Sequence, residues 1–212
     1  GLWEAREEAS QERQRLEDAE AERLAVLREV QRESEQAQAD LERLQARENQ
    51  LRGLITTLEE QRRRAEAADG PAAGTTGTTL SAGLEWPARG EVTRSFGRAV
   101  HPEYGTVTVN NGIGIAAGQG APVYAVAEGE VVFADHLPGF GECVIVDHGA
   151  GYYTLYANLG RVFATRGVAV SRGEILAEVG AALPHEDTAE LYFEIRQGRT
   201  PLNPQEWLRP GR

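Results

Sequence analysis

The stretch AELYFEIRQG, residues 189–198, has the pattern of a β-strand with two different faces. Its apolar residues stand at every second position, and successive side chains of a strand point to opposite sides. One face carries Leu191, Phe193 and Ile195. The other carries four polar residues, which are Glu190, Tyr192, Glu194 and Arg196. We therefore expect the first face to pack in a core and the second to be open and to decide what the domain does.

Strand signals surround this stretch from Trp86 onward. Three runs are short β-type segments separated by glycine-containing turns, and each predicts a β-hairpin. They are residues 122–135, 142–159 and 167–180. With residues 189–196, they predict that residues 86–212 form a mostly antiparallel, all-β domain.

The first 68 residues have the composition of a long helix. They contain no proline, one internal glycine (Gly53) and many Glu, Arg, Gln, Ala and Leu residues. A heptad repeat fits their second half, with Leu41, Glu48 and Ile55 at position a and Leu44, Leu51, Leu58 and Ala65 at position d. Such a seam predicts a coiled coil with a partner helix. The predicted class is α+β, with a coiled-coil helix over residues 1–68, a flexible Gly/Thr-rich linker over 69–85 and a β domain over 86–212.

Composition excludes several classes of function. Acidic residues outnumber basic ones by 33 to 22 and the formal net charge is -11, so nucleic acid is not expected as a partner. No apolar run reaches the roughly 18 residues needed to span a bilayer. The single cysteine, Cys143, lies in an apolar run and is expected to be a buried hydrophobe. One cysteine excludes an internal disulfide and a multi-cysteine zinc site.

Several blocks within residues 86–209 resemble, in the same order, those of the LytM or M23 peptidase domain. They include WPARGEVTRSFG (86–97), NNGIGIAAGQG (110–120), GYYTLYANL (151–159) and LYFEIRQG (191–198). Active members of that family are zinc endopeptidases that cut peptidoglycan cross-bridges. The resemblance implies that their zinc is held by a His-x-Gly-x-Asp block and by the second histidine of a His-x-His block. Two further histidines, one in a Tyr-x-His-Leu block and one opening the His-x-His block, assist the metal-bound water.

All five of these positions differ in this sequence. Asn110 stands at the first ligand histidine, Gly114 at the aspartate and Tyr192 at the last ligand. Asn158 and Glu190 stand at the two assisting histidines. An amide, a glycine and a neutral phenol do not make a catalytic zinc site. We therefore expect no metal, no other cofactor and no enzymatic activity. The four histidines, His101, His136, His148 and His185, are scattered over turns and do not predict another zinc site.

A degenerate domain of this kind behind a coiled coil is similar in layout to the EnvC-type murein hydrolase activators. This resemblance implies a protein of cell division and daughter-cell separation that binds and activates zinc-dependent N-acetylmuramyl-L-alanine amidases. It implies a periplasmic or other extracytoplasmic location, and a coiled coil coupled to an FtsE-FtsX-type division complex. Peptidoglycan is a further expected partner. The sequence contains no methionine and no signal peptide, and we expect it to be a processed or trimmed chain.

A groove is expected where the zinc site is lost, and it is predicted to bind the partner. Its residues are Asn110, Asn111, Gly114, Asn158, Glu190, Tyr192 and Arg196. A concave surface on a rigid β scaffold suits an amphipathic helix, and Arg196 can bind a carboxylate of that helix with two hydrogen bonds. Because residues 54–66 are amphipathic, a second hypothesis is that the N-terminal segment covers this groove until a membrane partner removes it. The alternative is that these residues only complete the coiled coil.

Three other interpretations are compatible with parts of the sequence. An active zinc endopeptidase is expected from the fold, but the five replaced positions oppose it. A passive peptidoglycan-binding or scaffold module would use the coiled coil to oligomerise. A biotinyl or lipoyl carrier is suggested by VAVSRGEILAEVG (168–180), but carriers need a lysine to modify and the sequence has none.

Overall fold

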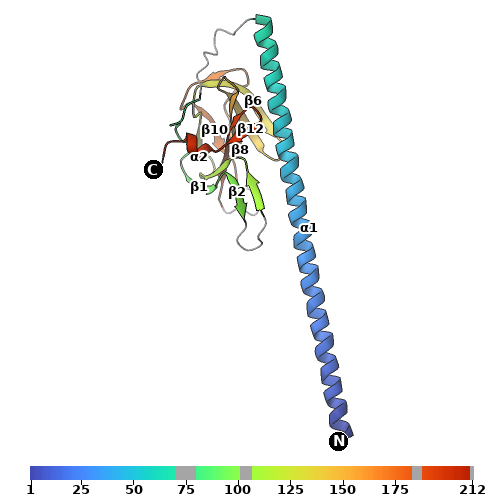
Figure 1. Ribbon diagram of the computed structural model, residues 1–212. Helices are drawn as coiled ribbons and strands as arrows, with labels where there is room; N and C mark the ends of the chain where they lie inside the picture. Colours follow the sequence, from blue (N-terminus) through green and yellow to red (C-terminus); the bar gives the residue numbers. More distant parts are fainter. Residues whose placement is uncertain (70–79, 101–106, 183–187, 211–212) are drawn as a thin grey trace. The chain divides into compact units, whose positions relative to one another are not determined.

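The computed structural model describes residues 1–69, 80–100, 107–182 and 188–210 of the 212-residue chain (Figure 1). The chain divides into two compact units, residues 1–45 and 46–212. The first unit is entirely helical, and the second contains the remainder of the same helix and all the strands. The fold class predicted from the sequence, a long helix followed by an antiparallel β domain, is confirmed.

Helix α1 extends from Leu2 to Asp69. Its sequence lacks proline and consists mainly of residues with high helix propensity, which explains its length. In residues 1–45, large apolar side chains such as Leu16, Leu24 and Leu27 are more than half exposed. No helix in the described parts of the chain is both long enough and apolar enough to cross a membrane.

The second unit is built on one large antiparallel sheet. The strands are β1 (Glu91–Arg94), β2 (Gly97–Val100), β3 (Val107–Asn110), β4 (Ile113–Ala116), β5 (Pro122–Tyr124), β6 (Gly129–Leu137), β7 (Gly141–Asp147), β8 (Tyr152–Val162), β9 (Ala169–Val170), β10 (Ile175–Val179), β11 (Glu190–Gln197) and β12 (Thr200–Leu202). The sheet runs in the order β1-β4-β11-β8-β7-β6-β9, with β10 paired to β5 and β8 and with β12 paired to β11. Strands β2 and β3 pair separately, and a short helix α2 (Pro204–Trp207) follows β12. Strand β11 therefore lies inside the sheet, between β4 and β8.

One of the three predicted hairpins is confirmed, and two are wrong. Strands β7 and β8 pair across the turn at residues 148–151, as residues 142–159 predicted. Strand β5 pairs with β10 instead of β6, and β9 pairs with β6 instead of β10. In both cases a short strand pairs with a strand that is distant in the sequence, and a local sequence pattern does not display such a pairing.

The domain has two apolar clusters, one on each side of the central strands. The apolar face of β11, with Leu191, Phe193 and Ile195 fully buried, belongs to the larger cluster and confirms the predicted core face. The smaller cluster lies on the other side of β7 and β8 and contains Cys143 and Ile145. Cys143 is buried, as predicted. Strands that are apolar on both faces need a cover on both faces.

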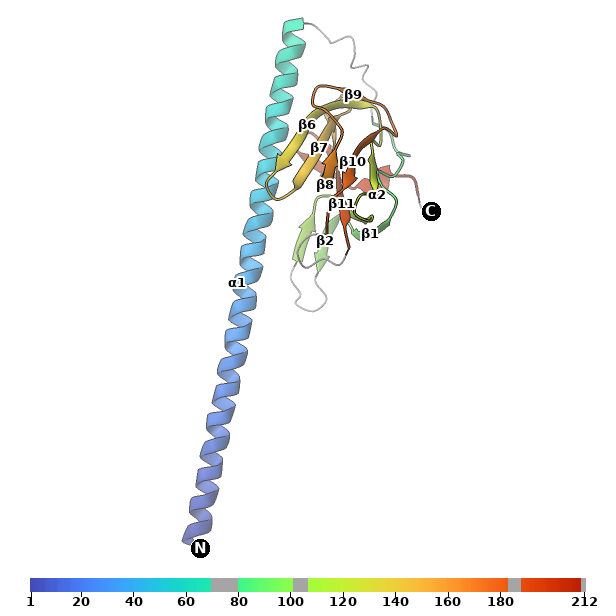
Figure 2. The same cartoon turned by 180° about the vertical axis from the view of Figure 1, so that it is seen from behind.

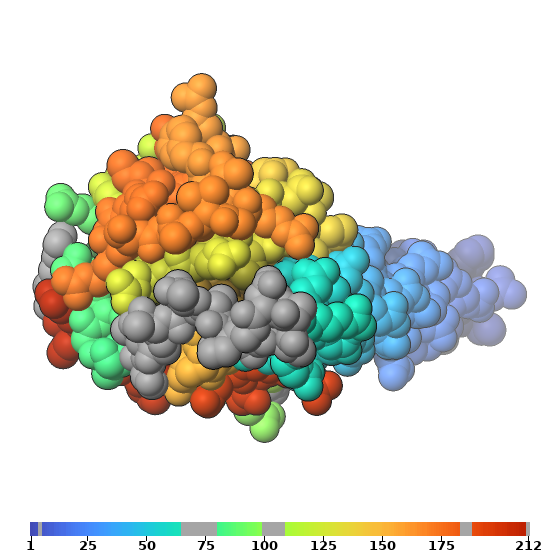
Figure 3. Space-filling model, turned by 90° about the horizontal axis from the view of Figure 1, so that it is seen from above, coloured from blue at the N-terminus to red at the C-terminus, as the bar shows by residue number. Residues whose placement is uncertain are grey.

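The C-terminal part of α1 provides that second cover (Figure 2). Leu51 and Ile55 are fully buried in the smaller cluster, and Leu58 is 7% exposed. Residues 46–62, which we call the arm, thus belong to the same compact unit as the β domain, and Figure 3 shows the end of α1 lying against it. In the described structure, this part of the apolar stripe packs on the sheet, and the coiled coil expected over residues 1–68 remains a prediction. Leu41 and Leu44, in the first unit, are 49% and 40% exposed, and the side chain of Ala65 lies outside the described residues.

The predicted linker, residues 69–85, is only partly described. Residues 70–79 lie outside the described parts of the chain. At its C-terminal end, Leu80 and Leu84 are 4% and 6% exposed and pack in the larger cluster, and Leu84 forms a bridge with Leu208. The proposed domain boundaries at residues 68, 69–85 and 86 remain a prediction.

Candidate functional site

The polar face of β11 is buried, not open as expected from its sequence pattern. Glu190, Glu194 and Arg196 are 5%, 1% and 1% exposed. Arg196 lies at the centre of a hydrogen-bonded network. It donates to Glu194 Oε2 at 2.9 Å, to the carbonyl of Arg199 at 2.8 Å and to Glu48 Oε1 at 2.9 Å. Because Glu48 belongs to the arm, this chain itself supplies the carboxylate that Arg196 was expected to bind in a partner.

The Glu48 carboxylate accepts hydrogen bonds from three side chains. Its Oε1 atom accepts from Arg196 and, at 2.7 Å, from Arg52 on the next turn. Its Oε2 atom accepts from the side-chain amide of Asn111 at 2.7 Å. Burial would raise the pKa of Glu48, but the hydrogen bonds from Arg196 and Arg52 outweigh it, and the pKa lies below its usual value. The carboxylate is therefore ionised and fully engaged in this arrangement.

Tyr192 and Glu194 form the next part of the network. The Tyr192 hydroxyl donates to Glu194 Oε1. Burial and the negative charge of Glu194 raise the pKa of Tyr192 well above its usual value, so its phenol is neutral. Burial also raises the pKa of Glu194, although Arg196 opposes this. The Arg47 guanidinium of the arm stacks over two rings, 3.8 Å from the centroid of Phe140 and 4.6 Å from that of Tyr192. Cation–π contacts of this kind stabilise a desolvated cation.

A second group of predicted residues lies at the other end of β11. The Glu190 carboxylate accepts from Thr93 at 2.7 Å and forms an ion pair with Arg94. Its backbone carbonyl accepts from the Asn158 side chain at 2.7 Å. Asn158 has a left-handed backbone, with φ of 60°, which asparagine tolerates better than most residues. Gly114 faces Glu190 and Thr93 at close range.

The seven predicted residues are therefore divided between two clusters and one separate position. Asn111, Tyr192 and Arg196 lie under the arm, whereas Gly114, Asn158 and Glu190 lie toward β1. Asn110, at the end of β3, donates to the carbonyl of Ser95 at 3.1 Å. The sequence reasoning missed five residues that complete these clusters: Arg47, Glu48, Glu194, Thr93 and Arg94. Two of them carried a signal in the sequence: Glu48, a charged residue at a core position of the heptad, and Glu194, on the polar face of residues 189–196.

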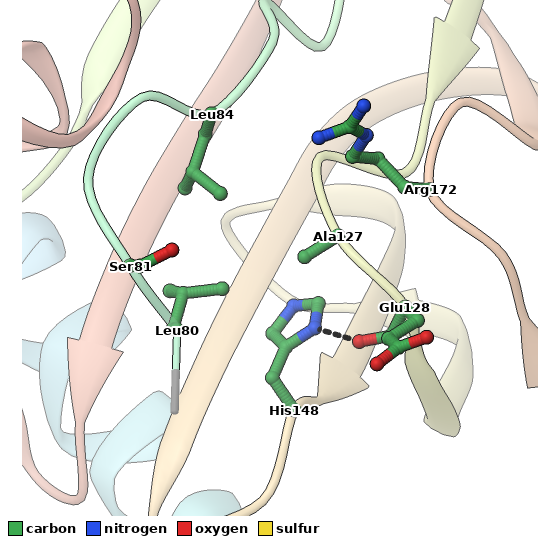
Figure 4. A pocket seen from close by; sticks show the side chains of 7 residues that line it. All are labelled: Leu80, Ser81, Leu84, Ala127, Glu128, His148 and Arg172. Atoms are coloured by element: carbon green, nitrogen blue, oxygen red, sulfur yellow. Dashed lines mark hydrogen bonds between the residues drawn. The ribbon is translucent and has the colours of Figure 1, made fainter. Parts of the chain in front are cut away.

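A separate cavity of about 300 Å³ lies at the turn between β5 and β6 (Figure 4). The His148 ring forms one wall of it, with Leu80 and Ala127 nearby. His148 Nδ1 is 2.6 Å from the Glu128 carbonyl and Nε2 is 2.8 Å from Thr154 Oγ1. Since the carbonyl can only accept, Nδ1 carries a proton, and Nε2 forms the hydrogen bond with Thr154 Oγ1. Burial lowers the pKa of His148, so the ring is held neutral.

Among the residues that the structure describes, no group of three or more His, Cys, Asp and Glu side chains is arranged to hold a metal ion. The residues at the three predicted ligand positions have other contacts. Tyr192 donates to Glu194, Asn110 donates to Ser95, and Gly114 has no side chain.

Comparison with known proteins relates these features to one family. Residues 108–204 match peptidase family M23. The chain is 36% identical over 123 residues to the murein hydrolase activator EnvC of Escherichia coli, covering 58% of this chain and 28% of that protein. It is 38% identical over 116 residues to the cell division protein DipM of Caulobacter vibrioides, covering 54% and 18%. This chain thus corresponds to less than a third of either relative.

Solved structures agree on the fold. A zinc-containing peptidase from Vibrio cholerae superimposes with a TM-score of 0.51 and 27% identity, covering 58% of this chain and 39% of that one. The matched region contains β4, β11 and every residue of the seven predicted for the groove. Residues 108–204 therefore match the M23 peptidase family, and this part of the chain resembles a LytM-type domain and the murein hydrolase activator EnvC.

Proposed function

We propose that this chain is a non-catalytic activator of zinc-dependent N-acetylmuramyl-L-alanine amidases, which cleave peptidoglycan in cell division. The similarity to EnvC, whose name describes a murein hydrolase activator, and to a cell division protein supports this role. The observation that carries the proposal is the occupied β11 face. A helix of the chain itself lies there and is bound by Arg196, Asn111 and Tyr192. A surface that binds one amphipathic helix has the chemistry to bind another.

The domain is proposed to have no peptidase activity. Catalytic zinc requires three protein ligands and an open position for water. At the corresponding positions, Gly114 offers no donor, Tyr192 is a neutral phenol bound to Glu194, and the Asn110 amide is bound to a backbone carbonyl. These residues do not fit the ion, and no catalytic step is assigned to it.

The arm indicates what the partner helix requires. It contributes a carboxylate at Glu48 for Arg196 and Asn111, and apolar side chains at Leu51 and Ile55 for the cluster around Cys143. The spacings of three and four residues place these groups on one face of a helix. We therefore propose that the amidase presents a helix with an acidic residue followed by apolar residues at this spacing, and that this helix replaces the arm.

Because the arm and the partner would use the same surface, the described state is proposed to be inactive. Activation then requires the arm to leave, and the partner helix is bound only in that open state. Moving such an equilibrium from almost fully closed to almost fully open requires about 5.5 kcal/mol of differential binding. A membrane division complex of the FtsE-FtsX type, acting on the N-terminal part of α1, is the proposed source of this displacement. The location would be extracytoplasmic, where peptidoglycan lies.

The proposal is tested by measuring dye release from labelled peptidoglycan by a zinc-dependent amidase, with and without the protein. Ile55→Asp places a charge in the buried arm contact and is expected to open the arm and increase stimulation above wild type. Leu41→Asp, at an exposed position of the same helix, is the control and is expected to behave like wild type.

The groove is tested in the opened background. Adding Arg196→Ala or Tyr192→Ala to Ile55→Asp is expected to abolish stimulation, because each removes a contact for the partner helix. Circular dichroism and thermal unfolding establish that the sheet is intact in each variant. If both double variants stimulate the amidase as strongly as Ile55→Asp alone, the partner does not bind on the β11 face.

A further inference from the structure

The Glu190 cluster, which consists of Thr93, Arg94 and Glu190, occupies an unusual position in the sheet. Strand β4 lies between β1 and β11, and Gly114 is the register partner of both Arg94 and Tyr192. Arg94, Gly114 and Tyr192 therefore lie side by side across three neighbouring strands, and the middle residue, Gly114, has no side chain. Tyr192 and Gly114 are two of the positions at which active relatives are expected to hold zinc.

Two consecutive residues of β1 reach the same carboxylate. In a regular strand, Thr93 and Arg94 would point to opposite faces. The pairing of β1 with β4 is irregular between Val92 and Arg94, as at a β-bulge, and both side chains contact Glu190. The Glu190 side chain is 6% exposed and that of Arg94 is 40% exposed. A carboxylate this deeply buried needs charge neutralisation, which Arg94 provides from the solvent side.

Gly114 provides the space for this arrangement. A Cβ atom at residue 114 would lie 2.8 Å from Glu190 Oε2 and 2.8 Å from Thr93 Oγ1. Both distances are shorter than the non-bonded contacts that a Cβ atom makes in proteins. The carboxylate of Glu190 and any side chain at residue 114, including the aspartate of an active site, therefore compete for one volume.

We infer that the Glu190 cluster replaces the metal centre: the Glu190 carboxylate fills the space of the metal-binding aspartate, and the Arg94 guanidinium supplies the positive charge in place of the ion. The groove floor is then held together by an internal ion pair and needs no metal. Because the Glu190 carboxylate fills the space next to residue 114, restoring zinc ligands at residues 110, 114 and 192 does not restore a zinc site. This inference concerns the floor of the groove and is independent of amidase activation, because its tests measure thermal stability and zinc affinity.

The first test is a set of double substitutions in the full chain, followed by thermal unfolding. Gly114→Ala is expected to lower the Tm by roughly 2–12 °C, the range for an overpacked site in a chain of this size. In the Glu190→Ala background, the same substitution is expected to cost less than half as much, because the colliding carboxylate is gone and the Thr93 hydroxyl, no longer hydrogen-bonded to Glu190, is free to rotate away from the added Cβ atom. In the Glu190→Gln background the collision persists, and the full cost is expected.

Gly112→Ala is the matched control. A Cβ atom there would collide with the backbone oxygen of Phe193, which Glu190→Ala does not remove. Its cost is expected to be the same with and without Glu190→Ala. If Gly114→Ala costs as much in the Glu190→Ala background as in the wild type, the carboxylate does not occupy the space of residue 114 and the inference is overturned.

The second test measures zinc affinity by competition with a chromophoric chelator. A ligand-restored variant carries Asn110→His, Gly114→Asp and Tyr192→His, and a second variant carries Glu190→His in addition. The second is expected to bind one zinc ion at least tenfold more tightly than the first. Equal zinc affinity of the two variants would contradict the inference. Wild type is expected to show the same Tm with added zinc and with added chelator, and a zinc-dependent rise that disappears in Glu190→Gln would also contradict it.

Discussion

The Arg196 guanidinium on β11 and the Glu48 carboxylate on α1 lie 2.9 Å apart, although 148 residues separate them in the chain. Arg196 is 1% exposed and the Glu48 side chain 19%, so most of this ion pair is removed from water. Ion pairs with little solvent access are costly to break, because one charge remains buried without its partner. The pair therefore joins the arm to the β domain, and its loss is expected to favour the open state.

Glu48→Gln is expected to destabilise the contact between the arm and the sheet by about 1–3 kcal/mol, the range for a hydrogen bond to a charged group. Amide hydrogen exchange over residues 46–62 is the measurement, and faster exchange is expected there, with little change in β7 and β8. Glu60→Gln is the control because Glu60 is exposed and pairs only within the helix in the described structure. Equal exchange in Glu48→Gln and wild type would contradict the role of this pair.

The pKa of Glu48 also gives the arm a pH dependence. The pKa is lower in the folded contact than its usual value of 4.5. A carboxylate with a depressed pKa stabilises the contact above pH 4.5, and this contribution is lost as the pH falls through the lower value. The protection factors of the arm amides, which are corrected for the intrinsic pH dependence of exchange, are therefore expected to fall below pH 4.5 in wild type and to change less in Glu48→Gln.

Leu51→Ala is expected to open the arm, because truncation of a buried leucine costs about 2–5 kcal/mol. Cys143, the single cysteine, lies in the same cluster, and burial raises the pKa of its thiol to about 12. Its reaction with a disulfide reagent under native conditions thus reports exposure of this face. A rate more than about tenfold above wild type is expected, since about 1.4 kcal/mol changes a population tenfold. Leu41→Ala, in the exposed helix of the first unit, is expected to leave the rate unchanged.

Asn158 combines a left-handed backbone with a hydrogen bond to Glu190, and two substitutions separate these features. Asn158→Gly removes the hydrogen bond, but glycine adopts φ of 60° without strain, so a loss of about 1 kcal/mol is expected. Asn158→Ala adds a backbone cost of about 1–2 kcal/mol. Urea unfolding should therefore rank the variants wild type, Gly, Ala. If Ala is as stable as Gly, the backbone conformation contributes nothing at this position.

His148 gives the β domain a second pH dependence, at higher pH. Burial lowers its pKa, while the Glu128 carbonyl and the charge of Asp147 oppose that shift. Glu128 and Arg172 also line its cavity. The unfolded chain therefore binds a proton more readily than the folded one, and stability falls as the pH decreases below about 6.5. Urea midpoints at pH 7.5 and pH 5.5 are expected to show this fall.

His148→Gln should be less stable at pH 7.5 but should lose less between the two pH values. His136→Gln is the matched control, because His136 lies at the surface and its side chain is 61% exposed. That variant is expected to retain the fall seen in wild type. A fall of the same size in His148→Gln would assign the pH dependence to another group.

Local patterns predicted much of this fold. The alternation in residues 189–196 identified the buried face of β11, and the glycine-containing turn at residues 148–151 identified the β7–β8 hairpin. Both depend on neighbouring residues, which a sequence displays directly. The pairing of β5 with β10 and of β6 with β9 depends on residues about 40 to 50 positions apart and could not be predicted this way.

The candidate site shows the same division. The replacement of zinc-site residues at positions 110, 114, 158, 190 and 192 is a prediction from the sequence, through its resemblance to a known family. The contacts of Glu190 with Thr93 and Arg94 are not, because the irregular pairing of β1 and the absence of a side chain at Gly114, on the strand between β1 and β11, create them together. A sequence pattern indicates which residues differ from the family, but it does not indicate which side chains fill the space at the predicted zinc site.

By itself, the sequence determined a long helix, a β domain and a strand with one apolar and one polar face. Only the tertiary structure decided that the polar face is covered, and by what. A heptad stripe such as Leu51 and Ile55 records that one side of a helix is apolar, but burial in a sheet and burial against another helix remove the same surface from water. Arg196 likewise needs a carboxylate, and the choice of Glu48 depends on the position at which the arm meets the sheet.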